Sequence, residues 1–128
     1  MKTLAQVRAT NALASANQRG MGLGQQGGNA LSGFPMLIRS DGILSALAFA
    51  VERKPNGDRK QQGCFLIADA VAKHLSCERL AVTEAEDPDS LVDELAKAAD
   101  ASQLRRATAE ALAFLSYCLL YTSDAADE

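Results

Sequence analysis

The sequence predicts an all-α fold, a compact bundle of about five to six helices joined by short connections. Alanine makes up about a fifth of the residues, whereas β-branched and aromatic residues are scarce, and this composition favours helix over strand. Apolar residues recur at helical spacing along most of the chain, and no segment shows the strict alternation of a strand. We expect residues 1–117 to form one domain, because a chain of about 120 residues encloses one core rather than two.

The first two helices are expected on either side of a glycine-rich run. Thr3 and Gln6 have the spacing of a capping box, so the first helix should begin there and extend to about Arg19. The run 20–28 predicts a flexible loop, because each glycine in a helix costs about 1 kcal/mol relative to alanine. A second helix is expected over 29–39, with Pro35 marking a kink or break. Two stripes of the first helix should pack against neighbours: Ala5, Ala9, Ala12 and Ala16, and beside them Leu4, Val7 and Ala14.

The third and fourth helices flank a turn that contains proline and glycine. Ser40 and Asp41 are candidate caps for a helix over 42–54, which is apolar around most of its circumference and should therefore be central. Residues 54–58, KPNGD, predict a helix-to-helix turn, after which Asp58 and Gln61 restart the chain. The fourth helix should end near Cys77. The expected buried residues are Ile43, Leu44, Leu47, Ala50 and Val51 in the third helix and Cys64, Ile67, Ala68, Val71 and Leu75 in the fourth, with Phe49 outside.

The last two helices follow an acidic connector at 78–87. Asp87 before Pro88 is a typical helix start, so a fifth helix is expected over 88–99. Asp100 or Ser102 should cap the final helix, with Gln103 completing a capping box. The final helix contains LRRATAEALAFLSY at 104–117. Its core-facing residues are expected to be Leu104, Thr108, Ala111, Leu112 and Leu115, flanked by Ala107 and Phe114.

Residues 118–128, CLLYTSDAADE, resemble the in-frame translation of a sequencing-library adapter. We therefore expect a non-native, disordered tail and exclude it from the reasoning on charge. Without its three acidic residues the formal net charge of the chain changes from −3 to zero. The acidic pI is then no guide to the partner, and what matters is where the cations cluster.

Two patterns that suggest chemistry are better explained by structure. GLGQQG at 22–27 matches a dinucleotide-binding pattern, but a helix precedes it where that site needs a strand. His74 lies between Cys64 and Cys77, yet structural zinc needs four ligands, so we expect a histidine at the edge of the apolar face and two small buried thiols. No nucleophile or carboxylate pair accompanies His74. The sequence thus predicts no enzyme, no catalytic residue, no cofactor, no metal and no small-molecule substrate.

The sequence also bears on location. No segment reaches the ~18 consecutive apolar residues that a membrane span needs, and the N-terminus lacks the basic-then-apolar design of a signal peptide. The small number of cysteines fits reduced thiols in a cytosolic protein better than a disulfide framework. We expect a cytoplasmic protein without a membrane partner.

Cations cluster in two places. Arg53, Lys54, Arg59 and Lys60 lie within eight residues, and Arg105 and Arg106 stand at the head of the final helix. A cationic pair near a helix N-terminus slightly opposes the helix dipole, which hints at a use. The alternative is a solvated surface, with Arg106 paired to Glu110 for ~0.2–0.5 kcal/mol. We expect the six cations to converge on one face as nucleic-acid contacts. The acidic residues crowd another segment: Glu84, Glu86, Asp87, Asp89, Asp93 and Glu94.

Three segments, in order and spacing, resemble the small subunit of the Cmr-type, type III-B CRISPR RNA-targeting effector complex. They are TLAQVRATNAL, FPMLIRSDGILSALAFAVERK and LRRATAEALAFLSY. The chain departs from the family at Tyr117, where tryptophan is usual, and in its glycine-rich run. The resemblance implies a non-catalytic antiviral subunit, copies of which stack beside the backbone subunit and bind guide and target RNA. The alternative is a generic helical protein-interaction module without RNA binding.

Overall fold

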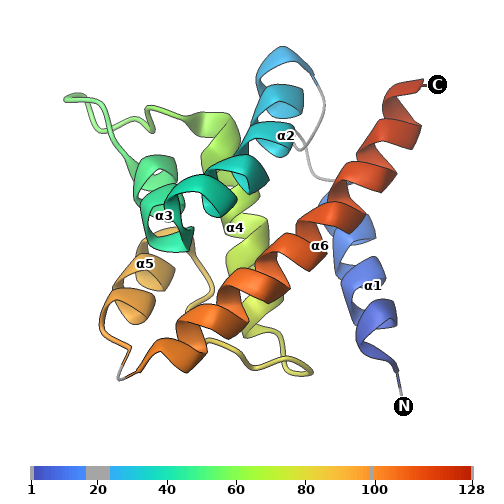
Figure 1. Ribbon diagram of the computed structural model, residues 1–128. Helices are drawn as coiled ribbons and strands as arrows, with labels where there is room; N and C mark the ends of the chain where they lie inside the picture. Colours follow the sequence, from blue (N-terminus) through green and yellow to red (C-terminus); the bar gives the residue numbers. More distant parts are fainter. Residues whose placement is uncertain (1, 17–23, 99, 128) are drawn as a thin grey trace.

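The computed structural model describes residues 2–16, 24–98 and 100–127, and this part of the chain folds into six α-helices without a β-strand (Figure 1). The prediction of an all-α bundle is confirmed. The helices are α1 (Leu4–Ala16), α2 (Gly24–Asp41), α3 (Ile43–Val51), α4 (Gln62–Ser76), α5 (Pro88–Ala96) and α6 (Ala101–Asp127).

The central helix is α4, which packs against each of the other five helices. Its apolar residues Ile67, Val71 and Leu75 are fully buried, and burial of one such side chain contributes roughly 1.5–3 kcal/mol. The expectation that the third helix is central was wrong. Although Leu47 is fully buried, α3 has only nine residues and leaves Phe49 37% exposed. The side of α3 opposite the core therefore faces solvent.

Three of the predicted helix starts are confirmed by their hydrogen bonds. The Thr3 amide donates to Gln6 Oε1 at 2.7 Å and the Gln6 amide donates to Thr3 Oγ1 at 3.2 Å, which completes the capping box of α1. Asp87 accepts from the Ser90 amide at 2.9 Å. Asp100 accepts from the Ser102 amide at 2.8 Å.

Two other predicted caps were wrong. Ser40 and Asp41 belong to α2, and Gly42 separates them from α3 with a φ of 92° and no side-chain cap. A left-handed residue here suits glycine, and it lets two helices follow each other almost directly. Gln103 does not complete a capping box with Asp100, because the side-chain amide of Gln103 donates to the Val82 carbonyl and to Glu94.

The segment around the glycine-rich run also differs from expectation. α2 begins at Gly24, so five residues that we assigned to a loop are helical, while 17–23 lie outside the described residues. The helix continues through Pro35 without a break, and Pro35 is buried. Packing against α3, α4 and α6 evidently compensates for the poor helix propensity of this segment.

The buried face of α1 is not the predicted alanine stripe. Val7, Ala12 and Ser15 are buried, whereas Ala5 and Leu4 are exposed and Ala9 is only half-buried. The face is shifted because Arg8 and Asn11 also point inward, toward polar partners on α4 and α6.

α6 extends beyond the domain end that we expected at Tyr117. It continues to Asp127, and Cys118 belongs to the core with no exposed surface. A helix therefore covers most of the segment that we expected to be disordered, and the non-native origin of 118–128 stays a prediction. Among the described residues, no helix combines the length and the apolar run that a bilayer crossing requires.

Candidate nucleic-acid interface

The first predicted cation cluster lies on a short hairpin, which we call the basic hairpin (residues 52–60). The Lys60 amide donates to the Glu52 carbonyl at 2.9 Å, and the Lys54 amide donates to the Asp58 carbonyl at 2.7 Å. Gly57 has a φ of 93°, a conformation that L residues rarely adopt, so the tip of the hairpin requires glycine. The predicted helix-to-helix turn is thus a projecting loop at the upper left of Figure 1.

The basic hairpin has four cations, of which Arg53 and Lys60 contact other groups of the hairpin itself. The Arg53 guanidinium donates to the Gly57 carbonyl at 2.7 Å and so helps to close the tip. Lys60 lies 3.4 Å from the Glu52 carboxylate, and both side chains are about half exposed. Lys54 is exposed and has no carboxylate within ion-pair distance in the described part of the chain.

Arg59 has a structural role. Its side chain is only 11% exposed and forms an ion pair with Asp89 on α5. It also donates to the Val51 carbonyl at 2.8 Å, and its Cζ lies 4.0 Å from the centre of the Phe65 ring on α4. Arginine suits a contact between secondary-structure elements, because its planar guanidinium can stack on an aromatic ring and pair with a carboxylate at the same time. Arg59 therefore ties the basic hairpin to α4 and α5, and it is not free to contact a strand of RNA.

The second predicted cluster is solvent-facing. Arg105 and Arg106 lie in the first turns of α6, and both are exposed. Neither has a carboxylate within ion-pair distance among the residues that the structure describes. The alternative pairing of Arg106 with Glu110 is wrong, because Glu110 is only 7% exposed and points into the bundle.

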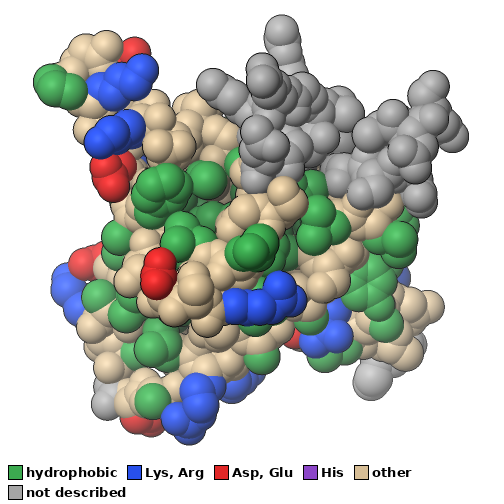
Figure 2. Space-filling model, turned by 45° about the horizontal axis from the view of Figure 1, so that its top comes forward, with side chains coloured by type: hydrophobic (Ala, Val, Ile, Leu, Met, Phe, Trp, Pro, Cys, Tyr) green, Lys and Arg blue, Asp and Glu red, His purple; other side chains and the backbone are tan. Residues whose placement is uncertain are grey.

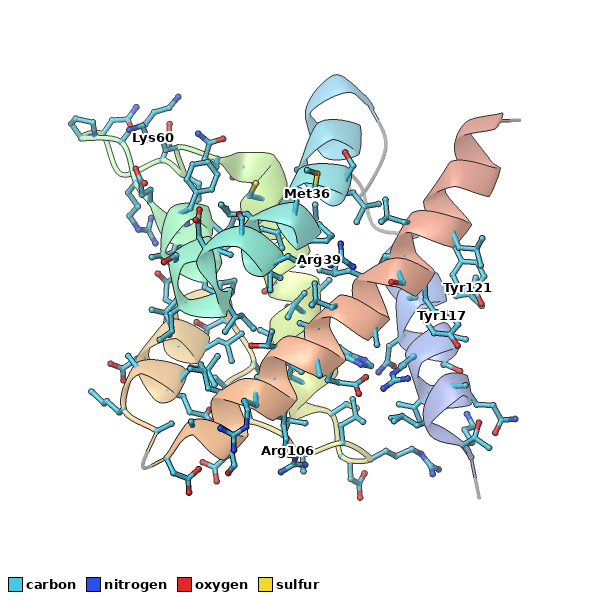
Figure 3. All side chains as sticks on the ribbon, viewed as in Figure 1. Met36, Arg39, Lys60, Arg106, Tyr117 and Tyr121 are labelled. Carbon is cyan, nitrogen blue, oxygen red and sulfur yellow. The ribbon has the colours of Figure 1, made fainter. Side chains whose placement is uncertain are left out.

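The six predicted cations do not converge, because the basic hairpin and the start of α6 lie at opposite ends of the molecule. Lys60 lies at the upper left of Figure 3 and Arg106 at its lower edge, with the bundle between them. Seen from another side, lysines and arginines form several separate groups (Figure 2). Sequence proximity could not reveal this, because the basic hairpin and the start of α6 join the bundle at different ends.

Two cations that we did not select share the lower end of the molecule with Arg106. Lys2 precedes α1, and Arg79 lies in the turn after α4. Both line one pocket of about 220 Å³. The N-terminus, this turn and the start of α6 all lie at the lower end of the view in Figure 1. Arg79 was missed because it stands in a connector that is otherwise acidic, and only the fold brings it beside Lys2.

A buried polar network joins α1, α4 and α6. Arg8 donates twice to Glu110, from Nε to Oε2 and from Nη2 to Oε1, both at 2.8 Å. His74 Nε2 donates to Glu110 Oε2 at 2.9 Å, while His74 Nδ1 accepts from Asn11 Nδ2 at 2.9 Å. The His74 ring stacks on Phe114 with centroids 4.2 Å apart. The prediction that His74 lies at the edge of the apolar face was wrong, since its side chain is fully buried.

The electrostatics of the network favour a neutral histidine beside an ionised carboxylate. Burial lowers the pKa of His74, and this outweighs the opposing effect of its bond to Glu110. Burial alone would raise the pKa of Glu110, but the hydrogen bonds from Arg8 and His74 outweigh it, so that the pKa of Glu110 is lowered. The network therefore holds α1 against α4 and α6, and its buried histidine and carboxylate do not form an acid–base pair that a substrate could reach.

The cysteines do not form a metal site with His74. Cys64 and Cys77 are half-buried rather than buried as expected, and Cys118 is buried. Burial raises the pKa of Cys64, and it raises the pKa of Cys118 to about 12, so both are thiols at neutral pH. Within the described ranges, no group of three or more histidine, cysteine, aspartate or glutamate side chains is placed to hold a metal ion.

Comparison with known proteins places the chain in a family. The family described as CRISPR-associated protein (Cas_Cmr5) matches residues 4–120, which include all six helices at least in part. No curated protein and no solved structure matches the chain. The chain therefore belongs to the Cmr5 family of CRISPR-associated proteins, the small subunits of Cmr-type, type III-B effector complexes.

Proposed function

We propose that this small subunit is non-catalytic and holds target RNA along the guide filament of its complex in antiviral defence, with Arg105 and Arg106 as principal phosphate contacts. The observation that supports this proposal is the pair of adjacent, exposed arginines at the start of α6, neither of which has an ion-pair partner in the described part of the chain. In RNA-guided complexes, base pairing reads sequence while protein cations contact the backbone.

The surroundings of this pair also favour a partner outside the fold. Arg105 and Arg106 are the fifth and sixth residues of α6, one turn beyond Asp100, which caps the helix through the Ser102 amide. Both side chains are exposed, so a phosphate group could reach them and accept charge-assisted hydrogen bonds from their guanidinium groups.

The basic hairpin supplies a second contact in this proposal. Arg53, Lys54 and Lys60 are exposed, and the loop that bears them projects from the bundle. Its position at the opposite end from Arg106 suits a subunit that follows an extended strand (Figure 3). Arg59 is excluded from the contact set by its ion pair with Asp89.

The test compares two double variants of equal charge. Arg105→Glu with Arg106→Glu reverses the proposed contacts. Lys73→Glu with Lys97→Glu reverses two exposed lysines that already pair with carboxylates one turn away. Affinity for a labelled single-stranded RNA is measured by fluorescence anisotropy, with circular dichroism to verify helicity. We expect the arginine variant to lose about tenfold or more in affinity and the lysine variant to lose about threefold or less. Equal losses would contradict a specific contact at Arg105 and Arg106.

The alternative function, a protein-interaction module without RNA binding, is favoured by one observation. Large apolar side chains lie exposed at Met36 (67%) and Leu13 (49%). Such side chains would serve contacts with other subunits of the complex, an association that family membership implies. If the wild-type chain did not bind RNA even at low salt, this alternative would be favoured.

A further inference from the structure

We infer that the pocket between α1 and the turn after α4 binds a phosphate group of the RNA backbone. This phosphate lies on the same strand as the phosphates held by Arg105 and Arg106, one or more nucleotides away from them. This inference rests on the proposed function, because it extends the same RNA path. The pocket measures about 220 Å³. Its lining includes Lys2, Thr10, Asn11, Cys77, Glu78 and Arg79.

The wall of the pocket is held in place by the buried network. Asn11 Nδ2 bonds to His74 Nδ1 at 2.9 Å and lies 3.7 Å from Cys77 Sγ, so Asn11 and Cys77 are fixed against each other. The turn that follows is tight, since the amides of Leu80 and Ala81 both donate to the Cys77 carbonyl, at 3.1 and 2.8 Å. Arg79 therefore projects from a constrained turn. A fixed wall reduces the conformational entropy that is lost when a ligand binds.

Size and charge favour a small anion over a larger ligand. Small-molecule sites usually measure about 300–1,000 Å³, so this pocket suits a single phosphate or nucleotide moiety. Lys2 and Arg79 have no ion-pair partner within the described ranges, and the hydroxyl of Thr10 adds a donor. Glu78 is the one carboxylate of the lining, so two cations face one anion and the pocket retains an excess positive charge.

The location of the pocket matches the proposed RNA path. Arg106 lies at the lower edge of Figure 3, and the N-terminus and the turn after α4 lie at the same end in Figure 1. An RNA strand that leaves Arg106 can therefore continue past Arg79 on this end of the bundle. The basic hairpin lies at the other end and does not belong to this set.

The experiment uses the full chain and four single variants that change charge in opposite directions. Arg79→Gln and Lys2→Gln each remove a cation from the pocket, Glu78→Gln removes its carboxylate, and Lys97→Gln removes an exposed cation that lies outside it. Affinity for a labelled single-stranded RNA is measured across salt concentrations. Arg79→Gln and Lys2→Gln should each weaken binding by about three- to tenfold and flatten the salt slope by about 0.7. Glu78→Gln should tighten binding, and Lys97→Gln should match the wild type.

A second readout locates the contact directly. Photocrosslinking of an RNA that contains 4-thiouridine, followed by mass spectrometry, should yield adducts on residues 77–79, and Arg79→Gln should reduce them. Unchanged affinity in Arg79→Gln and Lys2→Gln, together with a loss in Arg105→Glu/Arg106→Glu, would overturn the pocket and leave the proposed function intact. No RNA binding by the wild type would overturn both. If Arg79→Gln weakened capture of the other complex subunits but not of RNA, the pocket would hold an acidic peptide, and the inference would be wrong.

Discussion

The basic hairpin and the start of α6 both carry neighbouring cations, but the fold engages Arg53 and Arg59 of the hairpin and leaves both arginines of α6 exposed. In the hairpin, Arg53 closes its own loop and Arg59 is bound by Asp89, the Val51 carbonyl and the Phe65 ring. At the start of α6, Arg105 and Arg106 stay exposed without an ion pair in the described part of the chain. A cluster of cations in sequence therefore serves the fold where acidic and aromatic groups of other elements reach it, and is free for a partner where none do.

The same contrast occurs within one turn of α6. Arg106 points to solvent, while Glu110 points inward to Arg8 and His74. Helical spacing alone predicts that the two form a pair. The tertiary partners of Glu110 prevail because a buried carboxylate requires several donors, and α1 and α4 supply them.

The largest effect that would test this comparison is expected from Glu110→Ala. The substitution leaves Arg8 without its carboxylate and His74 Nε2 without an acceptor, both at the contact between α1 and the bundle. We expect the free energy of unfolding to fall by about 2–4 kcal/mol, as measured by urea denaturation. The exposed Glu86→Ala should change it by less than about 0.5 kcal/mol. A loss at Glu110 no larger than at Glu86 would show that the network does not hold α1.

A smaller loss of stability is expected from Arg59→Ala. The substitution removes a bond to the Val51 carbonyl, the stacking on Phe65 and an ion pair with Asp89, whose side chain is 51% exposed. Because the ion pair itself contributes little at such exposure, we expect about 1–2 kcal/mol in total. Lys54→Ala, three residues from the tip of the same hairpin, should have almost no effect. Similar stabilities for the two variants would remove the distinction between structural and free cations.

The smallest effect is expected from a change of pH, which acts on the network without removing an atom. The pKa of His74 is lowered in the folded protein, so below pH 6.5 the unfolded chain binds a proton that the folded chain does not. Stability should be complete above pH 6.5 and should fall as the pH decreases from there. The lowered pKa of Glu110 adds a further loss below pH 4.5.

Thermal unfolding of the wild type and of His74→Gln between pH 4 and 8 tests this. The decrease between pH 6.5 and 5 should be smaller in the variant. If stability instead rose as the pH fell through 6.5, His74 would be charged in the folded protein, and the neutral histidine inferred for the network would be wrong.

Local signals in the sequence predicted most of the helices but not the arrangement of charges. Capping at Thr3, Asp87 and Asp100 depends on residues at most three positions apart, so sequence spacing sufficed. The partner of Glu110 is 102 residues away at Arg8, and that of Arg59 is 30 residues away at Asp89. No periodicity reveals such pairs.

Two further differences have the same physical origin. Gly24 begins a helix because α2 packs on α3, α4 and α6, a tertiary gain that propensity does not include. Lys2 and Arg79 meet only after α1 docks beside the turn that follows α4. Arg105 and Arg106 are exposed on α6, and their contact with RNA stays a prediction.

The most direct test of the central claim is the salt dependence of RNA affinity for the wild type and for Arg105→Gln with Arg106→Gln. Each phosphate contact on a single strand contributes about −0.7 to the slope of log affinity against log salt concentration. If the two outward arginines bind phosphates, the double variant should lose affinity and its slope should be shallower by about 1.4. An unchanged slope would contradict the claim that these arginines contact RNA.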